Sequence, residues 1–224
     1  MKKIEFGNTF IIGDSYSSYA GTIPKEYNHF YIALGSDEDT PDNAYRNIGG
    51  PENMWWSKVL AAGNGNLLLN CSKSGTTVCA TTFNNYIDYK DCFVTRTKNY
   101  VTGSEINGEP INTVFIFGGT NDSWAKSPIG EITYSDFSDE NIKNFAPAYA
   151  ALINHFKVKV PKAQIISLVN KDKNEEEYVN AMHEICAHYN VPCIDVFGLE
   201  MENGHPTANG MQKIAEEVLD FLSK

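Results

Sequence analysis

Short apolar runs recur along the chain and are separated by segments with helical periodicity. Five near-continuous apolar runs, typical of strands buried on both faces, lie at 9–13, 66–70, 113–117, 164–169 and 191–196. Helix patterns lie at 51–62, 139–160, 175–189 and 206–222. Strands that alternate with helices imply a parallel sheet with right-handed crossovers. The pattern therefore predicts an α/β fold.

Two segments, 20–50 and 78–111, do not fit this alternation. The first is rich in Tyr, Gly, Pro, Asn and Asp, and the second is polar with scattered aromatic residues. Loops of this length within a compact domain tend to be functional or partly ordered excursions. The chain has 224 residues and shows no internal repeat or low-complexity linker. We therefore expect one domain over 1–224 that carries both segments as insertions.

Charge and cysteine content narrow the range of partners. The formal net charge is −10 and no Lys/Arg cluster occurs, which argues against binding to nucleic acid or to an anionic membrane surface. No stretch approaches the roughly 20 apolar residues of a membrane span. Five cysteines without C-x-x-C spacing are typical of reduced thiols, so we expect a cytoplasmic protein, or a secreted one if a leader has been removed. A small neutral substrate is favoured, and the sequence indicates no oligomeric state.

Four short polar motifs follow the predicted strands. They are Gly-Asp-Ser at 13–15, Ser-Gly at 74–75, Gly-Gly-Thr-Asn-Asp at 118–122 and His-Pro at 205–206. Open parallel sheets bind ligands outside the carboxyl ends of their strands. We therefore expect the four motifs to meet at one edge of the sheet.

Together, these motifs contain the parts of an acyl-transfer site. Ser15 supplies a nucleophilic hydroxyl, and His205 supplies a base that titrates near neutral pH. The backbone N–H groups of Ser15 and Gly75 and the side-chain amide of Asn121 would provide three oxyanion donors. Each residue alone would more often be a helix cap or turn former. Their joint occurrence, in type, order and location, favours the functional interpretation.

The four motifs resemble, in the same order, the four blocks of the SGNH/GDSL hydrolase family. The resemblance runs from residue 13 to 207. It implies a flavodoxin-like α/β/α sandwich in three layers, with a central, mostly parallel five-stranded sheet. It also implies that Ser15 is the nucleophile of an esterase, that Gly75 and Asn121 belong to the oxyanion hole, and that His205 is the base.

One position departs from the family pattern. The family usually has Asp three residues before the histidine, to orient the imidazole, and this chain has Glu202 there. Glutamate can accept the Nδ1–H hydrogen bond, but its extra methylene changes the reach. Three candidates for orienting His205 stay open, namely Glu202, Glu200 and a main-chain carbonyl. A Ser-His dyad without an acid is also compatible with the sequence.

Other site chemistry finds little support in the sequence. No pair of histidines has metal-ligand spacing and no phosphate-binding glycine motif occurs, so we expect neither a metal nor a cofactor. Trp124 and Tyr16 lie close to the motifs and are candidates for binding substrate, since flat rings pack against sugar or acyl faces.

We therefore expect a serine esterase that acts on small acyl esters, with an acetylated carbohydrate as the leading substrate. A non-catalytic carbohydrate-binding relative and an acyltransferase that uses the same site are the alternatives.

Overall fold

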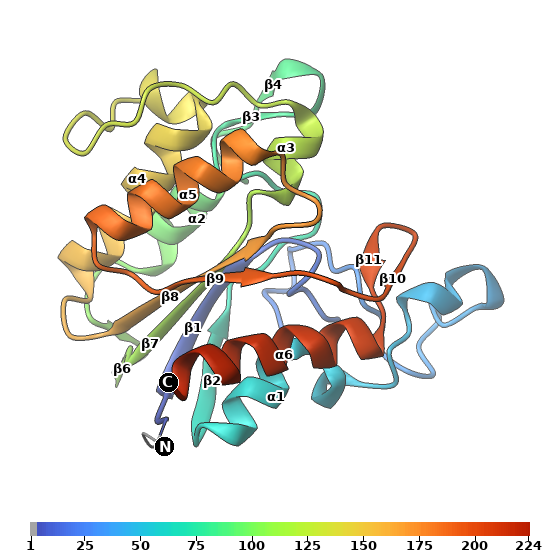
Figure 1. Ribbon diagram of the computed structural model, residues 1–224. Helices are drawn as coiled ribbons and strands as arrows, with labels where there is room; N and C mark the ends of the chain where they lie inside the picture. The colour runs from blue at the N-terminus through green and yellow to red at the C-terminus, as the bar shows by residue number, and fades with distance from the viewer. Residues whose placement is uncertain (1–3) are drawn as a thin grey trace.

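A five-stranded parallel sheet forms the centre of the molecule in the computed structural model, which describes residues 4–224 (Figure 1). Its strand order is β2-β1-β7-β8-β9, and every neighbouring pair is parallel. The strands are β1 (Gly7–Gly13), β2 (Gly65–Asn70), β7 (Thr113–Phe117), β8 (Gln164–Asn170) and β9 (Cys193–Val196). All five predicted apolar runs contain a strand, and burial is complete along β7, whereas the edge strand β2 is only partly buried.

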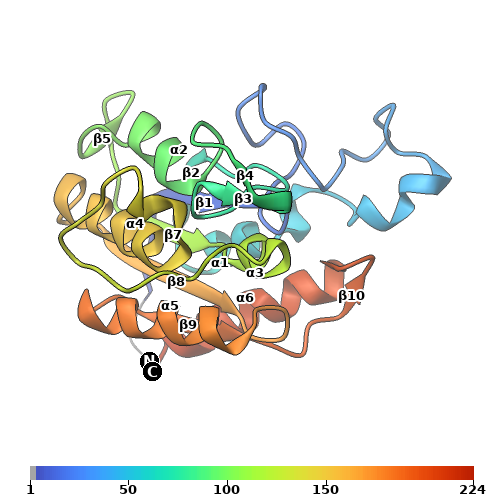
Figure 2. The ribbon, with the colours of Figure 1, turned by 90° about the horizontal axis from the view of Figure 1, so that it is seen from above.

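Helices cover both faces of the sheet, which gives three layers (Figures 1 and 2). Helices α1 (Trp55–Ala62) and α6 (Ala208–Leu222) pack together on one face. Helices α2 (Phe93–Tyr100), α4 (Phe145–Lys159) and α5 (Glu176–His188) lie on the other. A separate cluster of buried apolar side chains fills each interface. The predicted α/β/α sandwich is confirmed.

The helix starts differ from the sequence predictions. The predicted helix at 206–222 begins two residues later, because His205–Pro206 is strand β11 and pairs antiparallel with β10 (Met201–Glu202). Thr207 then caps α6 by accepting a hydrogen bond from the Gly210 N–H. The predicted helices at 51–62 and 139–160 each begin with a 3₁₀ turn, Pro51–Asn53 and Asn141–Lys143, before the α-helix.

The two insertions differ in structure. Segment 20–50 contains a 3₁₀ helix, Pro41–Arg46, and an isolated β-bridge that joins Tyr31 to Tyr19. Segment 78–111 contains helix α2 and two hairpins, β3 (Thr81–Thr82) with β4 (Tyr86–Ile87) and β5 (Glu105–Ile106) with β6 (Glu109–Pro110). A 3₁₀ turn, Phe83–Asn85, joins β3 to β4, and a short helix, α3 (Thr120–Ala125), follows β7. None of the helices in residues 4–224 is both long and apolar enough to cross a bilayer.

Candidate active site

Ser15 and His205 meet although 190 positions separate them in sequence. Ser15 follows the carboxyl end of β1, and His205 lies in the β10–β11 hairpin after β9. The Ser15 Oγ and the His205 Nε2 are 3.0 Å apart, within hydrogen-bond distance. Ser15 is buried, with 4% of its surface exposed. This pairing provides a hydroxyl with an adjacent base in a largely dehydrated setting.

A main-chain carbonyl, not a carboxylate, contacts the other imidazole nitrogen. The Nδ1 of His205 lies 3.0 Å from the carbonyl oxygen of Asn203. Because a carbonyl only accepts, the proton is on Nδ1, which leaves Nε2 to accept the Ser15 hydroxyl hydrogen. Asn203 and Gly204 have φ of 47° and 77°, and Asn-Gly is the pair favoured in a tight turn with two positive φ values. This turn brings the carbonyl to the ring.

The expectation that Glu202 orients His205 is not met. Glu202 pairs with His205 in the hairpin ladder but is exposed, and Nδ1 has the Asn203 carbonyl as its partner. The carboxylate of Glu200 instead accepts hydrogen bonds from Thr207 and Asn209 at the start of α6. Of the three candidates that the sequence left open, the structure has the main-chain carbonyl in contact with the ring.

Three aromatic rings surround the His205 imidazole. Phe30 stacks on it with ring centroids 3.4 Å apart and planes 11° apart. The rings of Tyr16 and Trp124 pack edge-to-face with the imidazole, with ring centroids 5.5 and 6.5 Å from it. Burial lowers the pKa of His205 below 6.5, and the positive charge of Arg46 lowers it further. The hydrogen bond to the Asn203 carbonyl raises the pKa but does not offset these effects. The imidazole is therefore held neutral to lower pH than a free histidine, as a general base requires.

The two aromatic residues predicted to bind substrate have different environments. Trp124 is 41% exposed beside the base, so its ring is accessible to a ligand. Tyr16 is 1% exposed, which leaves no face for a substrate. Its hydroxyl donates to the Gly204 carbonyl at 2.8 Å and so supports the hairpin that carries His205. Phe30 was not among the predicted site residues, because it lies in the 20–50 insertion and outside every motif.

The three predicted oxyanion donors lie in one neighbourhood. The Asn121 side-chain amide donates to the Thr76 carbonyl at 3.0 Å, and its nitrogen lies 3.4 Å from Asp14 Oδ2. Thr76 follows Gly75 and Asp14 precedes Ser15, so these contacts place the Asn121 amide near both backbone donors. Within residues 4–224, the backbone N–H groups of Ser15 and Gly75 donate no hydrogen bond to the protein. The two groups are thus available to a ligand.

Gly75 has a backbone conformation that suits this position. Its φ is +78°, in the left-handed region, and a Cβ there would meet no atom within 4 Å. The space beside the Gly75 backbone is therefore open.

Two buried carboxyl groups support the loops around the site. Asp14 accepts from the Tyr16 N–H at 3.0 Å, and burial raises its pKa to about 7. Asp122 accepts from the N–H groups of Val78 and Cys79, and burial raises its pKa to about 6. Asp14 therefore supports the loop that carries Ser15. The role of Asp122 was not predicted, since nothing local in the sequence indicates its partners.

A buried guanidinium joins the first two motifs. Arg96, in helix α2, is fully buried and donates to the Gly13 carbonyl at 3.1 Å and to the Thr76 hydroxyl at 2.8 Å. It also donates to the Cys71 carbonyl at the end of β2. The residue lies in a segment interpreted as an insertion, and sequence analysis did not identify it.

In the part of the chain that the structure describes, no three His, Cys, Asp or Glu side chains are grouped so as to hold a metal ion.

An α/β/α sandwich with a paired serine and histidine beyond the ends of its strands is the arrangement expected of a serine hydrolase, and comparison with known proteins identifies the family. A family model described as GDSL-like lipase/acylhydrolase matches residues 8–222. The chain therefore belongs to this family and is a hydrolase that acts on ester bonds. The resemblance stated from the four motifs is confirmed. A search of curated proteins found no match.

Solved structures support the same assignment. A GDSL-like lipase from Bacteroides ovatus is 31% identical with a TM-score of 0.84, and the match covers 98% of this chain and 99% of that one. A GDSL-like lipase from Bacteroides uniformis is also 31% identical with a TM-score of 0.84, over 97% and 96% of the two chains. A family two carbohydrate esterase from Clostridium thermocellum shares the fold at 16% identity and a TM-score of 0.61, over 99% of this chain and 65% of that one.

Proposed function

We propose that this protein is a serine esterase that hydrolyses small acyl esters through an acyl-enzyme on Ser15. The observation that carries the proposal is the 3.0 Å contact between the Ser15 hydroxyl and His205 Nε2, with Nδ1 held by a carbonyl. Ser15 Oγ attacks the ester carbonyl carbon while Nε2 takes the hydroxyl proton. The backbone N–H groups of Ser15 and Gly75 and the Asn121 amide stabilise the oxyanion.

The remaining steps use the same groups in reverse. His205 returns the proton to the departing alcohol, which leaves Ser15 acylated. It then takes a proton from water, which attacks the acyl carbon, and the carboxylic acid is released from Ser15. The imidazolium that forms twice in this cycle faces a neutral carbonyl instead of a carboxylate. The reaction therefore proceeds with a Ser-His dyad, supported by the rings around the base.

An acetyl ester on a carbohydrate is the substrate that we favour. The exposed ring of Trp124 lies beside His205, where it can pack against the apolar face of a sugar. One solved structure with this fold is of a carbohydrate esterase in complex with cellohexaose. The formal net charge of −10 also favours a neutral substrate over an anionic lipid surface.

The test combines a chromogenic substrate with an active-site label. Wild type should hydrolyse p-nitrophenyl acetate and be labelled on Ser15 by a fluorophosphonate, whereas Ser15→Ala and His205→Ala should each lose nearly all activity. Ser104→Ala is the matched control, because Ser104 is exposed and lies outside the site.

Two outcomes would favour the other functions. Equal behaviour of wild type and Ser15→Ala, with no label on Ser15, would indicate a non-catalytic binding protein. Ester formation on an added acceptor alcohol, in preference to release of free acid, would indicate an acyltransferase.

A further inference from the structure

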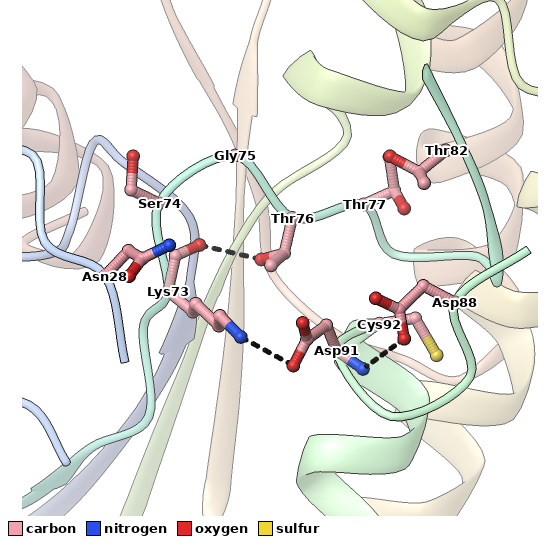
Figure 3. A pocket seen from close by; sticks show the side chains of 10 residues that line it. All are labelled: Asn28, Lys73, Ser74, Gly75, Thr76, Thr77, Thr82, Asp88, Asp91 and Cys92. Atoms are coloured by element: carbon pink, nitrogen blue, oxygen red, sulfur yellow. Dashed lines mark hydrogen bonds and ion pairs between the residues drawn. The ribbon is translucent and has the colours of Figure 1, made fainter. Parts of the chain in front are cut away.

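A polar pocket of about 170 Å³ adjoins the Gly75 loop (Figure 3). The 20–50 insertion lines it through Asn28, and the stretch 73–92 supplies the rest, from loop 73–77, the β3–β4 hairpin and the residues that lead into α2. The side chains that matter here are Asn28, Lys73, Thr82, Asp88 and Asp91. None of these residues belongs to the Ser15–His205 pair, so the pocket is an additional feature.

The pocket meets the catalytic region at loop 73–77. Gly75 and Thr76 line the pocket, and the Thr76 carbonyl accepts the hydrogen bond of the Asn121 amide. Open space lies beside Gly75, since a Cβ there would touch nothing within 4 Å. Because Gly75 itself lines the pocket, a ligand whose carbonyl oxygen accepts from the Gly75 N–H lies next to it.

The charged side chains of the pocket leave it with a net negative charge. Lys73 Nζ lies 2.6 Å from Asp91 Oδ1, so the one cation among the lining residues is already neutralised. Asp88 adds a further negative charge, and its Oδ1 accepts from the N–H groups of Lys90 and Asp91. A carboxylated or phosphorylated ligand would meet net negative charge here, which disfavours anions.

Several polar atoms that line the pocket have no protein partner. Within residues 4–224, no hydrogen bond involves the side chains of Asn28, Ser74 or Thr82, or the Oδ2 atom of Asp88. They comprise an amide, two hydroxyls and a carboxylate oxygen, which together donate and accept. Apart from Cys92, no aliphatic or aromatic side chain lines the pocket, so an alkyl chain would gain little by entering it. The lining suits a neutral group that carries several hydroxyls.

We propose that this pocket is a subsite for the hydroxylated part of the ester, a sugar or polyol unit attached to the acyl group that Ser15 attacks. The proposal rests on the esterase function proposed above. It assigns the alcohol portion of the substrate to Asn28, Thr82 and Asp88, and it makes these residues determinants of specificity.

The experiment compares two esters in matched variants. Asp88→Asn keeps an oxygen for the backbone N–H groups but replaces the other acceptor by a donor, and Thr82→Val removes a hydroxyl at constant size. We expect the ratio of kcat/KM for 6-O-acetylglucose to that for p-nitrophenyl acetate to fall about tenfold in Asp88→Asn and about threefold in Thr82→Val. Thr102→Val, at an exposed threonine outside the pocket, should leave the ratio unchanged.

Binding provides a readout that does not depend on turnover. In a Ser15→Ala background, calorimetry with 6-O-acetylglucose should show affinity that Asp88→Asn weakens several-fold. An unchanged kcat/KM ratio, or binding that is absent or equal in both proteins, overturns the subsite even if Ser15-dependent hydrolysis of p-nitrophenyl acetate is found. Conversely, Asp88-dependent binding without any Ser15-dependent hydrolysis would support the pocket and refute the esterase.

Discussion

The Phe30 ring lies flat against the His205 imidazole, with centroids 3.4 Å apart and planes inclined by 11°. Both backbone polar groups of Phe30 are hydrogen-bonded. Its N–H donates to Ser18 Oγ at 2.9 Å, and its carbonyl accepts from Arg46 Nε at 2.7 Å. Segment 20–50 is thus hydrogen-bonded to the loop that follows Ser15, and its Phe30 ring covers one face of the His205 imidazole. The stack limits rotation of an imidazole that has no carboxylate to orient it.

Substitution of Phe30 should alter both the rate and its pH dependence. Phe30→Ala opens the imidazole to water, so the pKa of His205 rises towards 6.5 and more of the base is protonated at a given pH below neutrality. We expect kcat to fall about tenfold at pH 8, because alignment is lost, and further at pH 6. A pH profile of p-nitrophenyl acetate hydrolysis measures both effects.

Phe30→Leu distinguishes the exclusion of water from the imidazole from the stacking of a flat ring on it. Leucine keeps apolar bulk over the imidazole but presents no flat face, so the acid limb of the profile should stay near that of wild type while kcat falls. Wild-type kcat and an unshifted profile in Phe30→Ala would show that the stack contributes nothing to the base.

Glu202→Gln should leave activity nearly unchanged. The carboxylate is exposed and the imidazole Nδ1 already has the Asn203 carbonyl as its partner, so the substitution removes no contact to the ring. We expect kcat within about twofold of wild type between pH 6 and 8, because no interaction made in the transition state is lost. Asp220→Asn, at another exposed acid, is the control for net charge. A loss of tenfold or more in Glu202→Gln alone would restore a triad with Glu202 as its acid.

The sheet could be predicted from the sequence because the central strands of such a fold are near-continuous apolar runs, which are a local signal. Strand β7 (Thr113–Phe117) is buried at every position, and its apolar run has the same bounds. Ser15, Asn121 and His205 could be identified for a similar reason, since each follows such a run within a short motif. Helix α2 was missed because its eight residues mix polar and apolar types. The burial of Arg96 depends in part on contacts distant in sequence, with Gly13, Cys71 and Thr76.

The partner of His205 could not be predicted from residue types alone. A search for an acid near the histidine selects Glu202, yet the contacting atom is a backbone oxygen, which every residue carries. The Asn203-Gly204 pair was the available signal, because it favours a tight hairpin turn that excludes a longer loop. Phe30 gave no such signal, since its contact with His205 depends on the path of a 31-residue insertion.

Removal of the Asn121 amide should affect turnover more than substrate binding. We expect Asn121→Ala to lower kcat by about 10²- to 10³-fold with little change in KM, because the amide stabilises charge that develops only in the transition state. Steady-state kinetics with p-nitrophenyl acetate tests this, and Asn99→Ala, at an exposed position, is the matched control. An increase in KM at constant kcat would mean that Asn121 binds the ground state instead.

Asp14 should make stability depend on pH in the opposite sense from an ordinary paired carboxylate. Burial raises its pKa from 3.8 to about 7. Between these values the folded chain keeps a proton that the unfolded chain has lost, so this group's contribution to the free energy of unfolding decreases as pH rises. Three pKa units correspond to at most about 4 kcal/mol. Of the charged neighbours, Asp122 raises the pKa of Asp14 and Arg96 lowers it.

Asp14→Asn removes this titration while it keeps an oxygen for the Tyr16 N–H. The stability of Asp14→Asn relative to wild type should therefore increase by up to about 4 kcal/mol between pH 4 and pH 8, with most of the change between pH 5 and 7. Urea unfolding at several pH values measures the difference, and comparison of two proteins cancels the contribution of carboxyl groups that titrate alike in both. Asp172→Asn, at an exposed aspartate, serves as the control. A difference that stays constant with pH would show that Asp14 is ionised in the folded protein throughout this range, and that its carboxylate is stabilised by its neighbours more than burial disfavours it.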